Sequence, residues 1–212
     1  PVRIYGNAAS LGDIDEAIAA GADGIGLFRT EFVFMDSDHL PTEDEQFAVY
    51  AEAVRRCKGK QLTIRTLDIG GDKSLPYLPL PREDNPFLGI RGIRFCLAHK
   101  EVFRPQIRAI LRASALGEVQ MMIPMVTTTD ELDTVLKLVR RCNESGGEKS
   151  HRHDGFGCRQ GRYPGGSLRG TGLHEGRQGF PDRNRGGCHK PFLPGPNQTA
   201  YFLTLTRTAW SA

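Results

Sequence analysis

The hydrophobic pattern along residues 1–145 switches repeatedly between short apolar runs and longer stretches of helical spacing. Short apolar runs bounded by glycine or polar residues predict strands, whereas apolar residues at every third or fourth position predict amphipathic helices. The predicted strands cover residues 2–5, 24–28, 61–67 and 119–124. The predicted helices cover residues 13–20, 42–57, 90–96, 101–114 and 129–142. Thr42, followed three residues later by Glu45, predicts a capping box at the start of the second helix.

This alternation predicts an α/β fold with a parallel sheet covered by helices, because unbroken apolar strands are typical of sheets buried on both faces. Four strand–helix units amount to half of a (β/α)8 barrel of the TIM type, so we expect about the first four units of such a barrel here. A half-barrel would leave both edges of its sheet open. In these barrels the active site lies at the carboxyl ends of the strands.

The pattern ends near Ser145, where the composition also changes. Residues 146–212 hold ten Lys or Arg against four Asp or Glu, whereas residues 1–145 hold 18 against 21. The last 67 residues also contain 14 of the 25 glycines. We therefore divide the chain into a partial barrel domain, 1–145, and an irregular, basic, Gly/Arg-rich tail, 146–212. Apolar residues return at Tyr201–Leu205, but we expect them to be too few for a core.

Two interpretations of the tail stay open. Its bias toward Arg, Gly, Pro, His and Cys is typical of GC-rich DNA translated out of frame, which makes a frame-shifted segment one hypothesis. A natural divergent tail is the other, and its positive charge would then suit nucleic acid. We regard nucleic-acid binding as the less favoured function.

The cysteine pattern and the apolar runs indicate the cellular compartment of the protein. The five cysteines form no CxxC pattern and no evident disulfide framework, which favours a reducing compartment and a cytoplasmic protein. No apolar run approaches the length that spans a bilayer, so no membrane association is expected. The chain starts at Pro1 without Met or a signal-peptide pattern and enters directly as a strand, which we interpret as the edge of a longer chain.

The candidate chemistry lies where two predicted strands end. The stretch Gly24–Phe32 breaks from an apolar run into Arg29, Thr30 and Glu31, and the next strand ends similarly in Arg65, Thr66, Leu67 and Asp68. The planar guanidinium matches phosphate and carboxylate geometry, so the repeat predicts two arginines that converge on one anion. The alternative for each arginine is a structural ion pair.

Five long segments resemble a known family. They are GADGIGLFRTEFVFMD, LPTEDEQFAVY, IRTLDIGGDKSLPYL, EDNPFLGIRGIR and RPQIRAILRASALG, in that order. Together they resemble the C-terminal, phosphoenolpyruvate-binding barrel of enzyme I, the phosphoenolpyruvate–protein phosphotransferase of the bacterial phosphotransferase system. The resemblance covers about residues 1–145. Pyruvate phosphate dikinase and phosphoenolpyruvate synthase share the RTE and NPxLGxRG elements, so a barrel fragment of such a relative is an alternative.

The resemblance implies a reaction and a set of partners. Phosphoenolpyruvate would bind with Mg2+ and give its phosphoryl group to a histidine on a separate domain, which would phosphorylate the carrier protein HPr in sugar uptake. Arg29, Arg65 and Arg91 would bind the substrate, and Lys73 would join them from the loop after the third strand. Asp68 and Asp72 lie in the same loop, and loop-ordering ion pairs are the alternative for these residues and Lys73. The family also forms homodimers.

Other family elements are not evident in this sequence. In the family, the acidic residues that bind magnesium belong to VETP-like and GTNDLTQY-like segments. The cysteine that protonates the enolate belongs to an MCGE-like segment. The phosphohistidine domain would precede Pro1, and none of the six histidines, including His39, has a catalytic context. We therefore assign no catalytic residue and no metal ligand, and we expect the fragment to be inactive alone. A dimerisation or binding module without catalysis is the alternative function.

Overall fold

The structure is a computed structural model that describes residues 2–70, 75, 77–78, 83–86, 88–147, 173–175 and 201–205. Its strands are β1 (Tyr5–Ala8), β2 (Gly24–Phe28), β3 (Gln61–Arg65), β4 (Val119–Ile123), β5 (Leu173–Glu175) and β6 (Tyr201–Leu205). Its helices are α1 (Leu11–Ala19), α2 (Glu31–Met35), α3 (Glu43–Arg56), α4 (Ile93–Ala98), α5 (Lys100–Ser114) and α6 (Thr129–Gly147).

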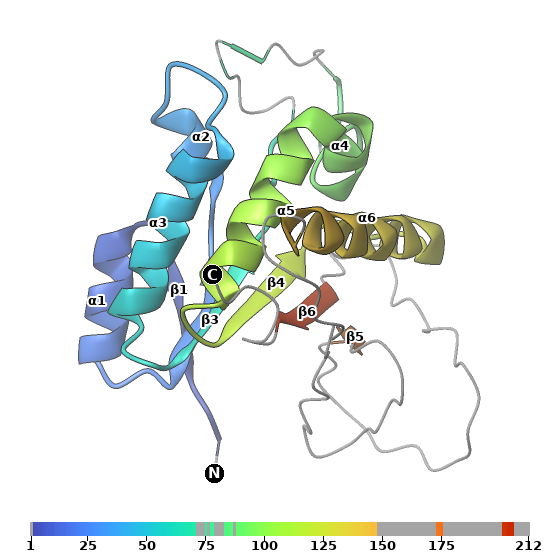
Figure 1. Cartoon of the computed structure of the whole chain (residues 1–212). Coiled ribbons are helices and arrows are strands. Elements are labelled where there is room, and N and C mark those ends of the chain that lie inside the picture. Colours follow the sequence, from blue (N-terminus) through green and yellow to red (C-terminus); the bar gives the residue numbers. More distant parts are fainter. Residues whose placement is uncertain are drawn as a thin grey trace.

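The first four strands pair in chain order and all run parallel. Helices alternate with them along the chain, as Figure 1 shows, so the predicted α/β alternation is confirmed. Apolar strand residues such as Leu62, Ile64 and Met121 are fully buried. The parallel arrangement brings the carboxyl ends of these four strands to one edge of the sheet, which is where the candidate arginines were expected.

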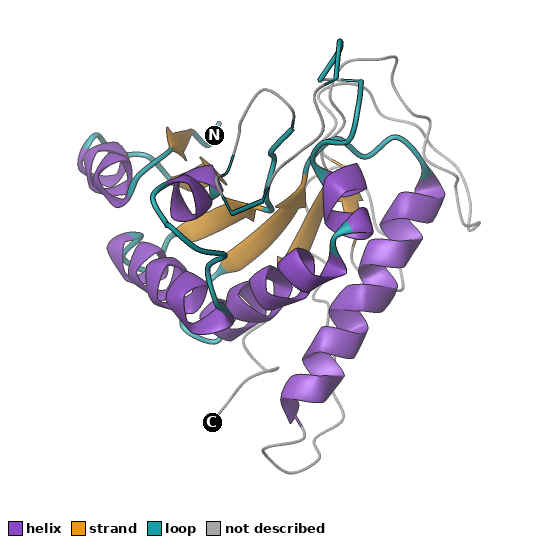
Figure 2. Cartoon of the chain, turned by 90° about the horizontal axis from the view of Figure 1, so that it is seen from above, coloured by secondary structure: helices purple, strands orange, loops and turns teal. Residues whose placement is uncertain are grey.

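The long helices form one continuous layer against the sheet. Helix α1 contacts α3, α3 contacts α5, and α5 contacts α6. Seen from above, these helices follow one side of the curved sheet (Figure 2). Helix α5 lies at the centre of this layer and buries Val102, Phe103, Ile107 and Ile110, which follow helical spacing. The layer therefore holds the sheet from one side and leaves the strand ends accessible to loops.

The start of α3 follows the predicted capping box. The Glu45 backbone N–H donates to the Thr42 hydroxyl at 3.3 Å, and the Thr42 backbone N–H donates to the Glu45 carboxylate at 2.8 Å. This reciprocal pair satisfies two of the N–H groups that a helix start leaves without intrahelical partners. The helix ends at Arg56 with Cys57 as its C-cap, close to the predicted boundary.

Three local predictions were wrong. The first strand begins at Tyr5 and not at Val2, whose side chain is 90% exposed and has no core to pack against. A short helix, α2, forms where a loop was expected after Arg29, because Phe34 becomes fully buried there. The helix expected from residue 90 begins at Ile93, since Gly92 has a φ of +55° that no helix accepts.

The tail contributes to the sheet, contrary to expectation. Strand β6 pairs antiparallel with β4, and β5 pairs with β6. Leu203 and Leu205 belong to the core and are buried, because alternate residues of β6 point to one face. The edge of β4 is therefore not open, as a bare half-barrel would leave it. The rest of the prediction for residues 146–212 lies outside the described residues, apart from the end of α6 and β5.

We predict that Leu203→Ala lowers the free energy of unfolding by about 2–5 kcal/mol, because it removes a buried side chain from the core. Leu88→Ala is the matched control: this leucine is 75% exposed, and its truncation should change stability by less than about 0.5 kcal/mol. Urea unfolding of both variants measures the difference. Equal, small effects would show that β6 does not pack on β4 in solution.

Candidate anion site at the carboxyl ends of the strands

Arg29 and Arg65 lie at neighbouring strand ends, as predicted. Arg65 is the last residue of β3, and Arg29 directly follows β2. The two strands run parallel with Phe28 opposite Ile64, so both arginines lie at the carboxyl edge of the sheet. That their guanidiniums face one pocket stays a prediction.

The Arg29 side chain is exposed, while its backbone is fixed. Its backbone N–H donates to the carbonyl of Ala8 at 2.9 Å, which ties the end of β2 to β1. The pKa of Asp13 is lowered mainly by the hydrogen bonds from Ala9 N–H and the Ser10 hydroxyl, with a smaller contribution from the Arg29 guanidinium. Within the described residues the Arg29 guanidinium has no ion pair at contact distance. The backbone of Arg29 is therefore held in place, while its guanidinium is exposed and can contact a ligand.

Arg65 has carboxylate partners on two sides. One terminal nitrogen, Nη2, contacts Glu31 at the start of α2, and Nη1 lies 3.2 Å from Asp68 Oδ2. The other carboxylate oxygen of Asp68 accepts a hydrogen bond from Arg91 Nε at 3.0 Å. Asp68 and Arg91 are buried, and the Arg65 side chain is 18% exposed. The ion-pair alternative for Arg65 is therefore present, and it brings the predicted residues Arg65, Asp68 and Arg91 into one cluster.

Arg91 reaches this cluster because a glycine follows it. A Cβ on Gly92 would lie 2.9 Å from Met125 Cγ and 3.3 Å from Asp68 Oδ1. The positive φ of Gly92 is also unfavourable for other residues. The Ile93 N–H donates to the Pro124 carbonyl at 3.3 Å and so fixes this loop to the end of β4.

Two buried polar atoms beside the cluster have no hydrogen-bond partner in the described part of the chain: Arg65 Nε and Thr66 Oγ1. Buried donors without partners are rare in proteins, and each one calls for an explanation such as an ion, a ligand or a water. Arg65 Nε is a charged donor, so an anion at this strand edge would suit it.

A buried amide, Gln106 on α5, links the two strand ends. Its Oε1 accepts from the Leu67 backbone N–H at 2.9 Å, and its Nε2 donates to Thr30 Oγ1 at 3.2 Å and to the Tyr50 hydroxyl at 3.1 Å. The Thr30 hydroxyl in turn donates to the Arg65 carbonyl at 2.9 Å. Burial raises the pKa of Tyr50, so its hydroxyl stays protonated.

Gln106 is not among the residues predicted from the sequence. The only local signal is that a glutamine lies on the apolar face of α5, between Phe103 and Ile110. A polar residue at such a position needs a buried partner, because an unsatisfied buried amide is costly. The identity of that partner follows only from the packing of α5 against the strand ends.

Comparison with known proteins identifies the family of this site. The family model of the PEP-utilising enzymes' PEP-binding domain, where PEP is phosphoenolpyruvate, matches residues 1–157. The chain belongs to this family. Its PEP-binding domain is therefore of the TIM-barrel type, to which the four described parallel strands and their helices conform.

Individual relatives are phosphotransferases by name. The phosphoenolpyruvate-protein phosphotransferase of Staphylococcus carnosus is 54% identical over 130 residues, covering 61% of this chain and 23% of the relative. The Bacillus subtilis protein of the same name is 51% identical over 130 residues, covering 61% and 23%. The multiphosphoryl transfer protein of Rhodobacter capsulatus is 53% identical over 133 residues, covering 61% and 16%. The chain thus spans about a quarter or less of the length of these curated relatives.

The remaining predicted residues of the PEP-binding domain divide into described and undescribed ones. Lys73 and Asp72 lie outside the described residues, and so do Cys158 and Cys188, for which no role is predicted. Cys96 is buried below the site, where its thiol lies 3.6 Å from the Leu67 carbonyl. Burial, and then the Asp68 charge, raise the pKa of Cys96, so its thiol is a poor acid and nucleophile at neutral pH.

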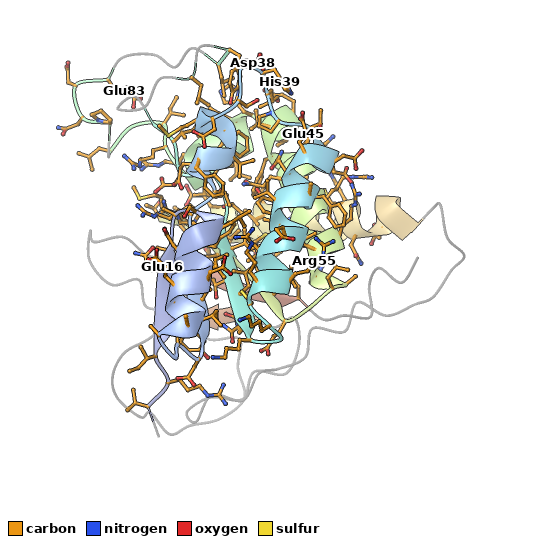
Figure 3. All side chains as sticks on the ribbon, turned by 90° about the vertical axis from the view of Figure 1, so that its left-hand side faces the viewer. Glu16, Asp38, His39, Glu45, Arg55 and Glu83 are labelled. Atoms are coloured by element: carbon orange, nitrogen blue, oxygen red, sulfur yellow. The ribbon has the colours of Figure 1, made fainter. Side chains whose placement is uncertain are left out.

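His39 lies in the loop between α2 and α3, where both ring nitrogens contact carboxylates. Nδ1 lies 2.7 Å from Asp38 Oδ1, and Nε2 lies 3.1 Å from Glu45 Oε1. Figure 3 shows the three side chains together at the start of α3. Carboxylates only accept, so both nitrogens donate when the imidazole is protonated, and Asp38 and then Glu45 raise the pKa of His39. These contacts give His39 a role in the α2–α3 loop and none in the arginine cluster.

The described residues offer no metal centre for the PEP-binding domain. No group of three or more His, Cys, Asp or Glu among them could hold a metal ion. Glu31 and Asp68, the acids nearest the arginines, both bind guanidiniums instead. The magnesium that the family implies therefore does not fit the described residues.

No helix in the described part of the chain is long and apolar enough to span a membrane.

We predict that Asp68→Asn lowers the free energy of unfolding by about 3–5 kcal/mol, because it removes the charge shared by two largely buried guanidiniums. Asp15→Asn is the control: Asp15 pairs with Arg56 at 2.8 Å but its side chain is 53% exposed, so the loss should not exceed about 1 kcal/mol. Denaturant unfolding compares the two. A smaller cost for Asp68→Asn than for Asp15→Asn would contradict the central position of this carboxylate.

Proposed function

We propose that this chain provides the phosphoenolpyruvate-binding part of a phosphoenolpyruvate–protein phosphotransferase that resembles enzyme I. Arg29, Arg65 and Arg91 bind the phosphate and carboxylate of the substrate. The observation that carries the proposal is the junction of Arg65, Asp68 and Arg91 at the strand edge that also presents Arg29. The identity of about half the residues to named phosphotransferases over 130 positions supports the same substrate.

The charges of the cluster suit an anion. Three arginines stand against two carboxylates, Glu31 and Asp68, which leaves one positive charge in excess. The carboxylates offset the repulsion between neighbouring guanidiniums and hold them in place before a ligand arrives. A phosphate would take donors that the carboxylates do not use, including the exposed Arg29 and the unpartnered Arg65 Nε. Lys73 would add a further cation from the loop after β3.

Phosphoryl transfer depends mostly on positioning and on neutralising charge, which is what arginines at rigid strand ends provide. In the proposed protein the phosphoryl group passes to a histidine on another domain and then to HPr, in sugar uptake. Magnesium would neutralise further charge on the substrate in the family, but the described residues do not form its site.

Location, assembly and the tail are further parts of the proposal. The buried cysteines Cys57, Cys96 and Cys142 form no disulfide, which suits a reducing cytoplasm, and homodimerisation follows from the family resemblance. The division into a barrel domain, 1–145, and a tail, 146–212, stays a hypothesis, as does the frame-shifted origin of the tail. Reading the other two frames of the gene downstream of Ser145 for the VETP-like and GTNDLTQY-like segments tests that origin.

We predict that the 212-residue chain binds phosphoenolpyruvate with a dissociation constant of about 1 mM or weaker, with little response to magnesium. Arg29→Ala should abolish this binding, because it removes the exposed guanidinium at the strand edge. Arg55→Ala is the charge-matched control: Arg55 is an exposed arginine on α3 that pairs with Glu52, remote from the strand ends (Figure 3).

NMR or calorimetric titration measures these affinities. An equal loss of affinity in both variants would mean that phosphoenolpyruvate binding depends only on the net charge of the protein. Micromolar, magnesium-dependent binding would show that residues outside the described part of the chain supply a metal site.

We also predict that the purified chain alone does not pass phosphate from phosphoenolpyruvate to HPr, because none of its histidines has the context of the phosphorylated one. Incubation with radiolabelled phosphoenolpyruvate and HPr, followed by gel separation, tests this. Label on HPr in the absence of any other enzyme would contradict the prediction.

A further inference from the structure

The side chain of Gln106 forms three hydrogen bonds, two of them to the segments that present the arginines. Its oxygen accepts from Leu67 N–H, two residues after Arg65, and its NH2 group donates to Thr30, one residue after Arg29. The second NH2 hydrogen goes to Tyr50 on α3. Gln106 is 1% exposed, so water does not compete for these contacts.

The Thr30 hydroxyl contacts Gln106 and Arg65 and does not cap its own helix. It occupies the N-cap position of α2, where a threonine hydroxyl normally accepts from the first turn of the helix. Here its side chain makes no capping hydrogen bond. The hydroxyl instead accepts from Gln106 at 3.2 Å and donates to the Arg65 carbonyl at 2.9 Å. One short path therefore connects the backbone beside Arg29 with that of Arg65.

We propose that Gln106 is a positioning residue that sets the relative placement of Arg29 and Arg65. This rests on the proposed function, in that the two arginines bind one phosphorylated substrate. Without the amide, the ends of β2 and β3 keep their ladder hydrogen bonds and the direct hydrogen bond from Thr30 to the Arg65 carbonyl, but Thr30 and Leu67 lose the side chain that fastens both of them to α5. Small displacements of charged donors weaken binding of a rigid anion strongly, because several hydrogen bonds must form at once.

Gln46 provides a matched comparison in the same network. It is also a fully buried glutamine, and its oxygen accepts from the Tyr50 hydroxyl at 3.2 Å, while its NH2 donates to the Pro41 carbonyl at 2.9 Å. Neither of these two contacts reaches a strand end that carries an arginine. Gln46→Met should therefore perturb the buried network as Gln106→Met does, but leave the arginines in place.

The experiment compares the full chain with its Gln106→Met and Gln46→Met variants by two readouts. The first is hydrogen exchange of the Arg65 Nε–H, followed by NMR with nitrogen-15-labelled arginine. The second is the affinity for phosphoenolpyruvate, from titration of the same signals. Thermal unfolding reports the stability of each variant. Thr30→Val interrupts the same path at its other end, because it removes the hydroxyl that accepts from Gln106 and donates to the Arg65 carbonyl.

We expect Gln106→Met to accelerate the Arg65 Nε–H exchange and to weaken phosphoenolpyruvate binding by about tenfold each. Thr30→Val should act in the same direction, and it carries the test if Gln106→Met does not fold. Gln46→Met should change both readouts by less than about twofold, as expected for a site outside the link.

Equal effects of Gln106→Met and Gln46→Met, or none from Gln106→Met and Thr30→Val, would overturn the positioning role. If the unmodified chain does not bind phosphoenolpyruvate, the proposed function fails by itself. The exchange of Arg65 Nε–H then still decides whether Gln106 positions this arginine.

Discussion

The carboxylate of Asp68 is the contact on which the candidate site depends. One of its oxygens holds Arg65 and the other holds Arg91, so two guanidiniums can lie close together in a largely buried place. Two guanidiniums that contact the same carboxylate would repel each other strongly in a place where little water is present. A shared anion offsets that repulsion, and Arg65 Nε keeps no hydrogen-bond partner among the described residues. The glycine at position 92 is a condition for this arrangement, because a side chain there would collide with Met125 and approach Asp68.

The sheet and its helix layer supply the rigidity that such a cluster needs. The guanidiniums of Arg65 and Arg91 are held by carboxylates before a ligand binds, whereas Arg29 has its backbone fixed at the strand end. Helix α5 has two parts in this: its apolar face packs into the core, and Gln106 on the same face fastens the two strand ends. A buried amide is costly unless its hydrogen bonds are made, and here Thr30 and Tyr50 accept from both of its N–H donors. The same residue thus contributes to stability and to the geometry of the arginines.

The tail changes the view of the fold as an exposed half-barrel. Strand β6 covers the edge of β4 in antiparallel orientation, whereas the strands before it are parallel. Antiparallel pairing needs no crossover helix and no further strand–helix unit, so a segment with little hydrophobic periodicity can still satisfy the edge. Five residues with two buried leucines are sufficient for this, which is why composition alone underestimated the segment.

The sequence by itself determined the features that depend on neighbours a few residues apart. The strand Gly24–Phe28, the capping box of Thr42 and Glu45, and the arrival of Arg29 and Arg65 at strand ends all follow from local periodicity and capping chemistry. The family motifs added the substrate class. The tertiary structure was needed to show which distant residues meet: Asp68 with Arg91, Gln106 with Thr30, and Leu203 with β4. These partners are 23, 76 and about 80 residues apart, and a hydrophobic pattern does not record which buried polar atoms will face each other once the helices pack on the sheet.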